Sequence, residues 1–320
     1  MKNLIVDHLS IRFGAANPVR DVCFQLDAGR SLGVVGESGS GKSLTALALM
    51  GLLPDQARVS GELSWGGRSL QAMSERERRA VRGREIAMIF QDPMTCLNPS
   101  FTVGYQIDEV LKLRLGIRSR VERRKRGLEI LSDVGIPAPE TRWDAYPHQL
   151  SGGMSQRVAI AQALASEPEL LIADEPTTAL DVTVQMQILE LLFSLKKKRG
   201  MSLLFVTHDL SVAGRLCDEI LVMYAGQSLE LASANAILKF PQHPYTQALL
   251  AARPHLGGGA SERLKTIPGS VPRANEQIRG CVFAARCEKK FDRCEREAPV
   301  FSSASQFNRC FLSKNERGSL

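Results

Sequence analysis

The stretch GESGSGKS at residues 36–43 decides the fold. It fits the pattern G-x-x-x-x-G-K-[ST] of a phosphate-binding loop, in which glycines let successive backbone N–H groups point at phosphate oxygens. An apolar strand candidate, SLGVV at 31–35, precedes it, and a buried helix candidate, LTALALM at 44–50, follows and adds positive potential at its N-terminus. Lys42 is expected to reach the β- and γ-phosphates, and the Ser43 hydroxyl to bind Mg²⁺. The chain is therefore predicted to bind nucleotide.

The bulk composition is that of a soluble protein with one large α/β domain and an appendage. The chain has 320 residues, of which 44% are hydrophobic and 23% are charged. Its apolar runs fall short of the roughly 18 residues needed to span a bilayer, and an acidic residue interrupts the N-terminal stretch MKNLIVD. We expect a cytoplasmic protein whose membrane association depends on a partner.

The net charge of +7 is concentrated in two basic stretches, at 112–126 and 196–199. A basic run can bind nucleic acid or anionic lipid, or it can be the solvated face of a helix. Apolar residues such as Val121 and Leu128 are interleaved with the first stretch, which favours the helix face.

Short apolar runs alternate with helical segments along the chain, as in a parallel sheet covered by helices. The predicted strands are residues 4–6, 9–13, 22–26, 31–35, 86–90, 170–173 and 202–206. The predicted helices are residues 44–50, 154–165 and 182–198, with a mainly helical region at 92–150. Beyond residue 230 the composition shifts to Pro, Gly and polar residues, and LGGGA at 256–260 predicts a linker before a cysteine-bearing tail.

Two acids follow the apolar strand LLIA at residues 170–173. Asp174 at the strand tip can hold Mg²⁺, and Glu175 is placed to polarise a water for attack on a γ-phosphate. The alternative for such a pair is the N-cap of a helix. His208, at the tip of the next strand, is either a contact to the γ-phosphate or a structural histidine.

A second anion cradle is predicted at residues 150–157, LSGGMSQR, where Ser and two glycines open a helix. One nucleotide needs only one cradle. We therefore expect Ser151, Gly152 and Gly153 of one copy to cap the γ-phosphate held by Lys42 of another copy, so that nucleotide joins two domains and hydrolysis releases them.

With these motifs in this order, the chain resembles ABC-type ATPases over residues 3–230. FQDPM at 90–94, DEPTTALDVTVQ at 174–185 and HPYTQALL at 243–250 are similar to the importers of oligopeptides, dipeptides and nickel. The resemblance implies an α/β P-loop ATPase with a RecA-like parallel sheet core, an N-terminal antiparallel β region and a helical subdomain at about 92–155. The ATPase domain would cover residues 1–232, and residues 233–320 would form a small C-terminal extension.

The resemblance also assigns site residues. Nucleotide contacts fall on Phe13, Gly36, Glu37, Ser38, Gly39, Ser40, Gly41, Lys42, Ser43 and Leu44. Catalysis falls on Glu175, His208 and Gln91, the Mg²⁺ ligands are Ser43, Gln91 and Asp174, and the signature residues acting in trans are Ser151, Gly152, Gly153 and Gln156, with Asp181 in the D-loop. Phe13 would stack on adenine, although a core phenylalanine is an equally valid interpretation. Cys96 and Ser155 depart from the usual pattern, and Ser155 is expected to alter contacts of the signature helix.

The function implied is that of the ATP-hydrolysing motor of an importer for di- or oligopeptides or a related small solute, at the cytoplasmic face of the inner membrane. The expected partners are two transmembrane permease subunits, an extracytoplasmic solute-binding protein and a second ATPase, in a heterodimer rather than a homodimer. A nickel or metallophore importer is the alternative, and a non-transport ABC ATPase acting on nucleic acid is a less favoured one. We expect no nucleic-acid partner.

Four cysteines, Cys281, Cys287, Cys294 and Cys310, cluster near the C-terminus. In a cytosolic protein such a cluster suggests metal rather than disulfides. None of the spacings is the tight C-x₂₋₄-C of structural zinc sites, whereas four separated thiolates suit a [4Fe–4S] cluster. The resemblance also favours the iron–sulfur cluster over zinc, and four reduced cysteines packing a small tail remain the third possibility.

Overall fold

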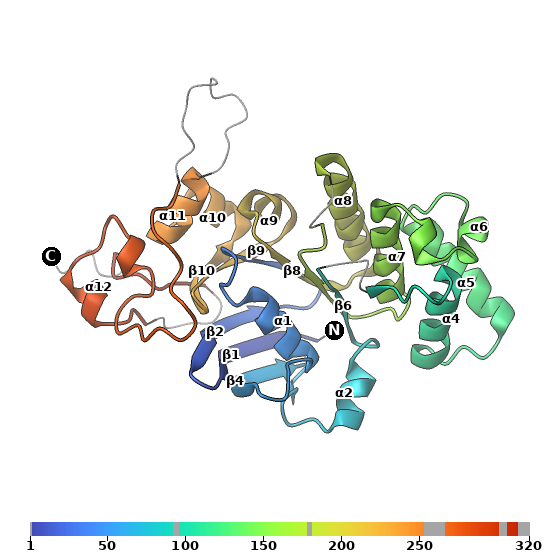
Figure 1. Cartoon of the computed structure of the whole chain (residues 1–320), viewed down its shortest axis with the longest axis horizontal. Helices are drawn as coiled ribbons and strands as arrows, with labels where there is room; N and C mark the ends of the chain where they lie inside the picture. The colour runs from blue at the N-terminus through green and yellow to red at the C-terminus, as the bar shows by residue number, and fades with distance from the viewer. Residues whose placement is uncertain (1, 92–95, 178–180, 253–265, 301–305, 313–320) are drawn as a thin grey trace, which may run out of the picture. The chain divides into compact units, whose positions relative to one another are not determined.

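The computed structural model describes residues 2–91, 96–177, 181–252, 266–300 and 306–312. The chain divides into two compact units (Figure 1). We call residues 3–27, 31–71 and 206–320 the phosphate-loop unit, and residues 1–2, 28–30 and 72–205 the helical unit. Three predicted features lie wholly or partly outside the described residues: most of the FQDPM segment, the loop before Asp181 and the LGGGA linker.

The phosphate-loop unit begins with an antiparallel sheet in the strand order β2-β1-β4-β5. Its strands are β1 (Leu4–Phe13), β2 (Ala16–Leu26), β4 (Arg58–Trp65) and β5 (Arg68–Ser69). Two strands predicted at 4–6 and 9–13 are one strand, because the β1–β2 register shifts between Val6 and Leu9. His8 within this irregularity has a φ of 49°. A bulge of this kind changes the alternation of buried residues without ending the strand.

The second sheet of this unit has the order β11-β10-β9-β3. Its strands are β3 (Ser31–Val35), β9 (Glu219–Tyr224), β10 (Gln227–Ser233) and β11 (Phe307–Asn308). β3 and β9 are parallel, whereas β9 and β10 form a hairpin. Ala225 and Gly226 both have positive φ at the hairpin turn, as its two-residue connection requires.

The helices of the phosphate-loop unit lie before and after these strands. They are α1 (Lys42–Met50), α9 (Leu210–Leu216), α10 (Ala234–Lys239), α11 (Pro244–Ala251), η2 (Ala284–Arg286) and α12 (Asp292–Arg296). β10 runs through the predicted domain boundary at 232/233 and ends at Ser233, and the residues on both sides belong to this unit. The boundary itself stays a prediction.

The helical unit contains three neighbouring strands in the order β8-β7-β6, with β6 and β7 parallel. The strands are β6 (Ile86–Ile89), β7 (Leu170–Asp174) and β8 (Ser202–Thr207), which ends in the other unit. The helices are α2 (Glu75–Val81), α4 (Val103–Arg114), α5 (Arg120–Asp133), α6 (Pro139–Trp143), η1 (Pro147–Gln149), α7 (Gly152–Leu164) and α8 (Val182–Arg199). The expected α/β class, antiparallel β region and helical segment are confirmed.

Trp143 holds α4, α5 and α6 together, and these helices gather beside α7 in Figure 1. The indole is buried against two glycines. A Cβ on Gly104 of α4 would lie 2.2 Å from the ring, and a Cβ on Gly127 of α5 would lie 2.3 Å from it. Only glycine allows both backbones to approach the indole so closely.

The basic stretches of the helical unit form ion pairs within it. Arg123 is buried and donates to Asp108 at 2.7 Å, and Arg126 pairs with Glu167. Lys198 and Arg199 of the second stretch both contact Asp133. These contacts support helix faces as the explanation of the charge. Among the described residues, no helix combines the length and the apolar character that crossing a bilayer requires.

Candidate functional site

The phosphate loop lies between β3 and α1, and two of its glycines are sterically required. A Cβ on Gly36 would lie 2.1 Å from the Met223 carbonyl oxygen. Gly41 is the N-cap of α1 with a φ of 94°, and a Cβ there would lie 2.8 Å from the Pro18 carbonyl oxygen. The loop curls so tightly into the N-terminus of α1 that these two positions require glycine.

Lys42 is folded back onto this loop. The side chain is only 5% exposed and donates to the carbonyl oxygens of Gly36 at 2.8 Å and Glu37 at 3.0 Å. Its ammonium group is therefore held against the loop, in the residue that opens α1. Ser38 and Gly39 are exposed, and Ser43 and Leu44 are half-buried.

Two other predicted site residues belong to the phosphate-loop unit. Phe13 ends β1 and is half-buried, which fits either a ring that adenine can stack on or a peripheral core residue. His208 follows β8 directly and is exposed. His208 is thus not a buried structural histidine, and its contact to a γ-phosphate stays a prediction.

The acidic pair lies at the end of β7 in the helical unit. Asp174 is the last residue of the strand and is 5% exposed. Glu175 follows with a φ of 44°, a left-handed conformation that is uncommon for a residue with a side chain. The Gln91 side-chain amide donates to a carboxylate oxygen of Glu175 at 3.2 Å. Two motifs that lie 84 residues apart in sequence are thus brought into contact.

The signature residues open α7. The Ser151 hydroxyl caps the helix by accepting a hydrogen bond from the Met154 N–H, and Ser151 and Gly152 are exposed. A Cβ on Gly153 would lie 2.9 Å from Val184 of α8. The exposed N-terminus of a 13-residue helix is suited to an anion from a second molecule.

Other residues near the signature are oriented differently. Gln156 is fully buried, and neither end of its amide has a hydrogen-bond partner among the described residues, so the predicted contact in trans would have to be indirect. The Ser155 hydroxyl is likewise buried without a described partner. Asp181 is exposed and caps α8 by accepting from the Val184 N–H at 2.9 Å. Cys96, the other departure from the family pattern, is half-buried.

The four C-terminal cysteines line one cavity, which His243, Phe283 and Phe311 help to close. The Cys281 N–H donates to the Cys294 carbonyl oxygen at 2.8 Å. Burial raises the pKa of Cys281 to about 11, and burial likewise raises the pKa of Cys287 and Cys310. Neighbouring thiolates add to these shifts because like charges repel. The structure therefore brings the predicted cluster together.

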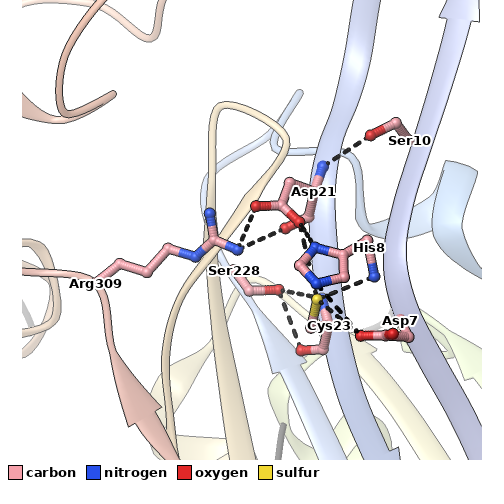
Figure 2. A network of polar contacts seen from close by, with 7 residues as sticks. All are labelled: Asp7, His8, Ser10, Asp21, Cys23, Ser228 and Arg309. Carbon is pink, nitrogen blue, oxygen red and sulfur yellow. Dashed lines mark hydrogen bonds and ion pairs between the residues drawn. The ribbon is translucent and has the colours of Figure 1, made fainter. Parts of the chain in front are cut away.

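A polar network on β1 and β2 was not predicted from the sequence (Figure 2). The ligand atoms of Asp7, His8 and Cys23 lie within 4.8 Å of one another, a spacing that can hold a metal ion. The buried Cys23 thiol accepts from the His8 N–H at 3.0 Å and donates to Asp7 at 3.7 Å, and burial raises its pKa to about 12.

A cation already balances the charge in this network. Arg309 donates to the Asp21 carboxylate at 2.7 Å, and His8 lies 2.5 Å from the other oxygen of that carboxylate (Figure 2). The network therefore ties the segment carrying β11 to the first sheet. Cys23 itself is fully buried. His8 and Asp21 both have a positive φ where their side chains approach each other. The sequence gives no sign of this backbone conformation.

Comparison with known proteins agrees with this geometry. The profile of the ABC transporter family matches residues 19–178, and that of the oligopeptide/dipeptide transporter C-terminal region matches residues 229–294. The chain is 51% identical over 307 residues to the dipeptide transport ATP-binding protein DppD of Escherichia coli K12, covering 94% of this chain and 93% of that one. It is 49% identical over 306 residues to the oligopeptide transport ATP-binding protein OppD of Bacillus subtilis 168, covering 93% and 85%.

Two solved structures support the fold. The dimeric ABC transporter cassette MJ0796 has a TM-score of 0.64 at 30% identity, covering 72% of this chain and 98% of that one. A post-hydrolysis state of MJ0796 bound to ADP and Pi has a TM-score of 0.63 at 31% identity, covering 73% and 99%. With a phosphate loop, an acidic strand end and a glycine-opened signature helix in place, the chain belongs to the ABC transporter family as an ATP-binding subunit with ATPase chemistry.

Proposed function

We propose that this chain is the ATP-hydrolysing motor of an importer for dipeptides or oligopeptides. The observation that carries the proposal is a sterically fixed phosphate loop in a chain that matches a dipeptide transport ATP-binding protein across 94% of its length. The match of residues 229–294 to the oligopeptide/dipeptide transporter C-terminal region supports peptide over nickel or a metallophore.

The residues of each unit suit defined roles toward ATP. Lys42 and the N–H groups of the phosphate loop would bind the phosphates, and Phe13 would stack on adenine. Mg²⁺ suits the oxygen donors Ser43, Gln91 and Asp174, because it prefers hydroxyl, amide and carboxylate oxygens, and when bound it would neutralise phosphate charge. Asp174 is buried at a strand end, which fixes its carboxylate for this purpose.

Glu175 would polarise the attacking water, and His208 would contact the γ-phosphate. Gln91 donates a hydrogen bond to Glu175, so loss of the γ-phosphate would shift the position of Gln91 at the start of the helical segment. Ser151 and the glycines after it would bind the γ-phosphate of a second ATPase subunit, with Asp181 organising the facing site. ATP then bridges two subunits, and hydrolysis removes the charge that holds them.

We further propose a heterodimer of two ATPase subunits on the cytoplasmic face of the inner membrane, with two permease subunits and an extracytoplasmic solute-binding protein. Purification of the tagged chain from its native membrane in mild detergent, with mass spectrometry of its partners, tests this assembly. We expect two multi-spanning proteins, a second ATPase and a solute-binding protein. Recovery of ribosomes or DNA-repair factors would refute the transport function.

The substrate is tested in liposomes that contain the recovered assembly and its binding protein. Di- and oligopeptides should stimulate phosphate release, and Ni²⁺ should not. The Lys42→Ala variant is the matched control, because it removes the phosphate contact and leaves the transport pathway unchanged. Stimulation by Ni²⁺ alone would assign the metal-importer alternative.

We also propose that Cys281, Cys287, Cys294 and Cys310 hold a [4Fe–4S] cluster. The four cysteines line one cavity, so their thiols face a common space. None of their spacings is the tight C-x₂₋₄-C of structural zinc sites, and four separated thiolates suit an iron–sulfur cluster. When bound, such a cluster would staple a segment that has little core of its own.

The absorption spectrum and metal content of anaerobically purified protein test the cluster. A brown protein with broad visible absorption and four irons per chain is expected, and Cys287→Ser should abolish the colour. Cys217→Ser is the matched control, since Cys217 lies outside the cavity. A colourless protein with one zinc per chain would assign the zinc alternative.

A further inference from the structure

The second residue of the phosphate loop, Glu37, is held by residues from the C-terminal part of the chain. Arg286 donates two parallel hydrogen bonds to its carboxylate, at 2.7 and 3.2 Å. The Tyr245 hydroxyl accepts a hydrogen bond from the Glu37 N–H at 3.1 Å. Bidentate arginine–carboxylate pairs are among the stronger and more directional hydrogen bonds in proteins.

Every donor of the Arg286 guanidinium is used. Besides Glu37, it donates to the carbonyl oxygens of Pro268 at 2.8 Å and Ile267 at 3.1 Å, and to the Tyr224 hydroxyl at 3.3 Å. Its side chain is 6% exposed, whereas that of Glu37 is 27% exposed. Burial alone would lower the pKa of Arg286, but its hydrogen bonds with Glu37 and Tyr224 raise it.

An aromatic cluster supports this arrangement. The rings of Tyr224 and Tyr245 lie 4.7 Å apart, and Phe283 lies within 5.3 Å of both. The Arg286 guanidinium lies 5.6 Å from the Tyr224 ring centroid. We call the contacts of Arg286 and Tyr245 with Glu37 the clamp. The clamp is therefore supported by packed aromatic side chains rather than by exposed flexible ones.

Glu37 in turn contacts Lys42 through its backbone carbonyl group. The Glu37 carbonyl oxygen accepts from the Lys42 ammonium at 3.0 Å and from the Ser40 N–H at 3.2 Å. The N–H, the carbonyl and the carboxylate of Glu37 are all bonded, so the residue cannot rotate without breaking the clamp. A phosphate loop fixed in advance loses less conformational entropy when nucleotide binds.

We infer that Arg286 and Tyr245 are positioning residues for the ATP site, which hold the phosphate loop ready for nucleotide through Glu37. The C-terminal region is then part of the nucleotide site and not only an appendage. The inference rests on nucleotide binding at the phosphate loop. Binding of Mg·ADP by the unchanged chain in the same titrations separates a failure of the clamp from a failure of that assignment.

Calorimetric titration of the full chain with Mg·ADP tests the clamp. Arg286→Met and Glu37→Ala should each weaken binding roughly tenfold, within the range usual for coupled sites. The variant that carries both Arg286→Met and Glu37→Ala should bind Mg·ADP no more weakly than the single variant with the lower affinity, because both changes remove the same contact. Arg286→Lys, which keeps the charge but not the fork, should have an intermediate effect. Arg296→Met, an exposed arginine of the same region, is the matched control and should bind normally.

A purely structural role for Arg286 predicts a different pattern. It would lower the thermal midpoint of the ligand-free chain, and the Glu37→Ala and Arg286→Met effects on binding would add. In the assembled transporter, the clamp predicts a raised KM for ATP with kcat within about twofold of the unchanged protein, because it holds the loop and not the hydrolytic groups. Additive effects, or normal Mg·ADP binding by Glu37→Ala, would overturn the inference. If Arg286→Met does not fold, the Glu37→Ala and Tyr245→Phe titrations decide alone.

Discussion

Glu175 adopts a left-handed backbone conformation directly after the last residue of β7. Such a conformation costs about 1–2 kcal/mol for a residue with a side chain and persists where the surroundings impose it. Here the strand end, buried Asp174 and the hydrogen bond from Gln91 impose it. The hydrogen bond from Gln91 holds the carboxylate of this residue, whose proposed role is to polarise the attacking water.

Replacing Glu175 with Gln tests its role as the base. The amide has the same shape but cannot polarise water, so phosphate release should fall by about 100-fold or more while nucleotide binding is kept. Together with the second ATPase subunit, the ATP-bound variant should also elute as a dimer, because the bridging γ-phosphate persists. Rapid hydrolysis by this variant would show that another group activates the water.

A single methyl group at Gly36 should disrupt the phosphate loop. The added Cβ would lie 2.1 Å from a backbone carbonyl oxygen, and backbone has little freedom to move away. We expect Gly36→Ala to lose nucleotide binding and about 3 kcal/mol of unfolding free energy. Gly39→Ala is the control: its Cβ meets nothing within 4 Å, so only the left-handed φ of 79° is penalised, by about 1 kcal/mol. Equal losses in denaturant titrations would contradict this explanation.

The sequence predicted most of the strands that are continuous apolar runs and those helices that begin at glycines. β3, β7 and β8 lie within one or two residues of the expected bounds. β4 was missed because its first five residues are exposed and only Val59 among them is apolar, so it shows no apolar run. β9 was missed although residues 220–224 form a continuous apolar run, and its pairing with β10 was missed because an Ala-Gly turn is a weak hairpin signal. The site motifs were predictable from local spacing, whereas the Arg286–Glu37 pair joins positions 249 residues apart and has no local signature.

The packing of α4, α5 and α6 depends on two glycines. Gly104→Ala would place a methyl group 2.2 Å from the Trp143 ring, and we expect it to lower the unfolding free energy by about 3 kcal/mol. Trp143→Leu should make room for the methyl group, so the double variant should be more stable than the sum of the two single losses allows. Additive losses in thermal or denaturant unfolding would show that the indole is not the obstacle.

An ion pair joins the end of α5 to the end of α8 and should make stability depend on pH. The hydrogen bond from Lys198 lowers the pKa of Asp133 below its usual 3.8, and Arg199 adds to this effect. Because the folded carboxyl has the lower pKa, its stabilisation is complete well above pH 3.8 and is lost as the pH falls through the folded value. Asp133→Asn should cost about 0.5 kcal/mol at neutral pH, a small value because the pair is partly exposed to water.

The control for this pair is Lys198→Met, which should show a smaller loss at neutral pH, because Arg199 still contacts Asp133. Both losses should shrink in acid, where the carboxyl is protonated in every folded and unfolded molecule. Denaturant titrations at neutral and acidic pH measure this directly. A loss from Asp133→Asn that is independent of pH would point to packing instead of charge.

At the scale of the whole molecule, three arginine contacts hold the C-terminal region to the phosphate loop and the first sheet, in addition to the pairing of β11 with β10. Arg286 contacts Glu37 of the phosphate loop, and Arg309 contacts Asp21 of β2. Arg20 donates to the carbonyl oxygens of Ala274 and Glu276. Because the region is held in this way to the first sheet and to the phosphate loop, we expect it to respond when nucleotide changes either one.

Thermodynamic linkage makes that response measurable. If Arg286 favours nucleotide binding, nucleotide must stabilise the Arg286 contacts by the same factor. Saturating Mg·ADP should therefore slow hydrogen exchange at the backbone N–H groups of 281–287, which include the η2 turn, and Arg286→Met should remove that protection while Arg296→Met preserves it. Peptide-level mass spectrometry of the exchanged chain resolves this segment from the phosphate loop. Equal exchange with and without Mg·ADP, in a chain that binds it, would mean that the C-terminal region does not sense the nucleotide site.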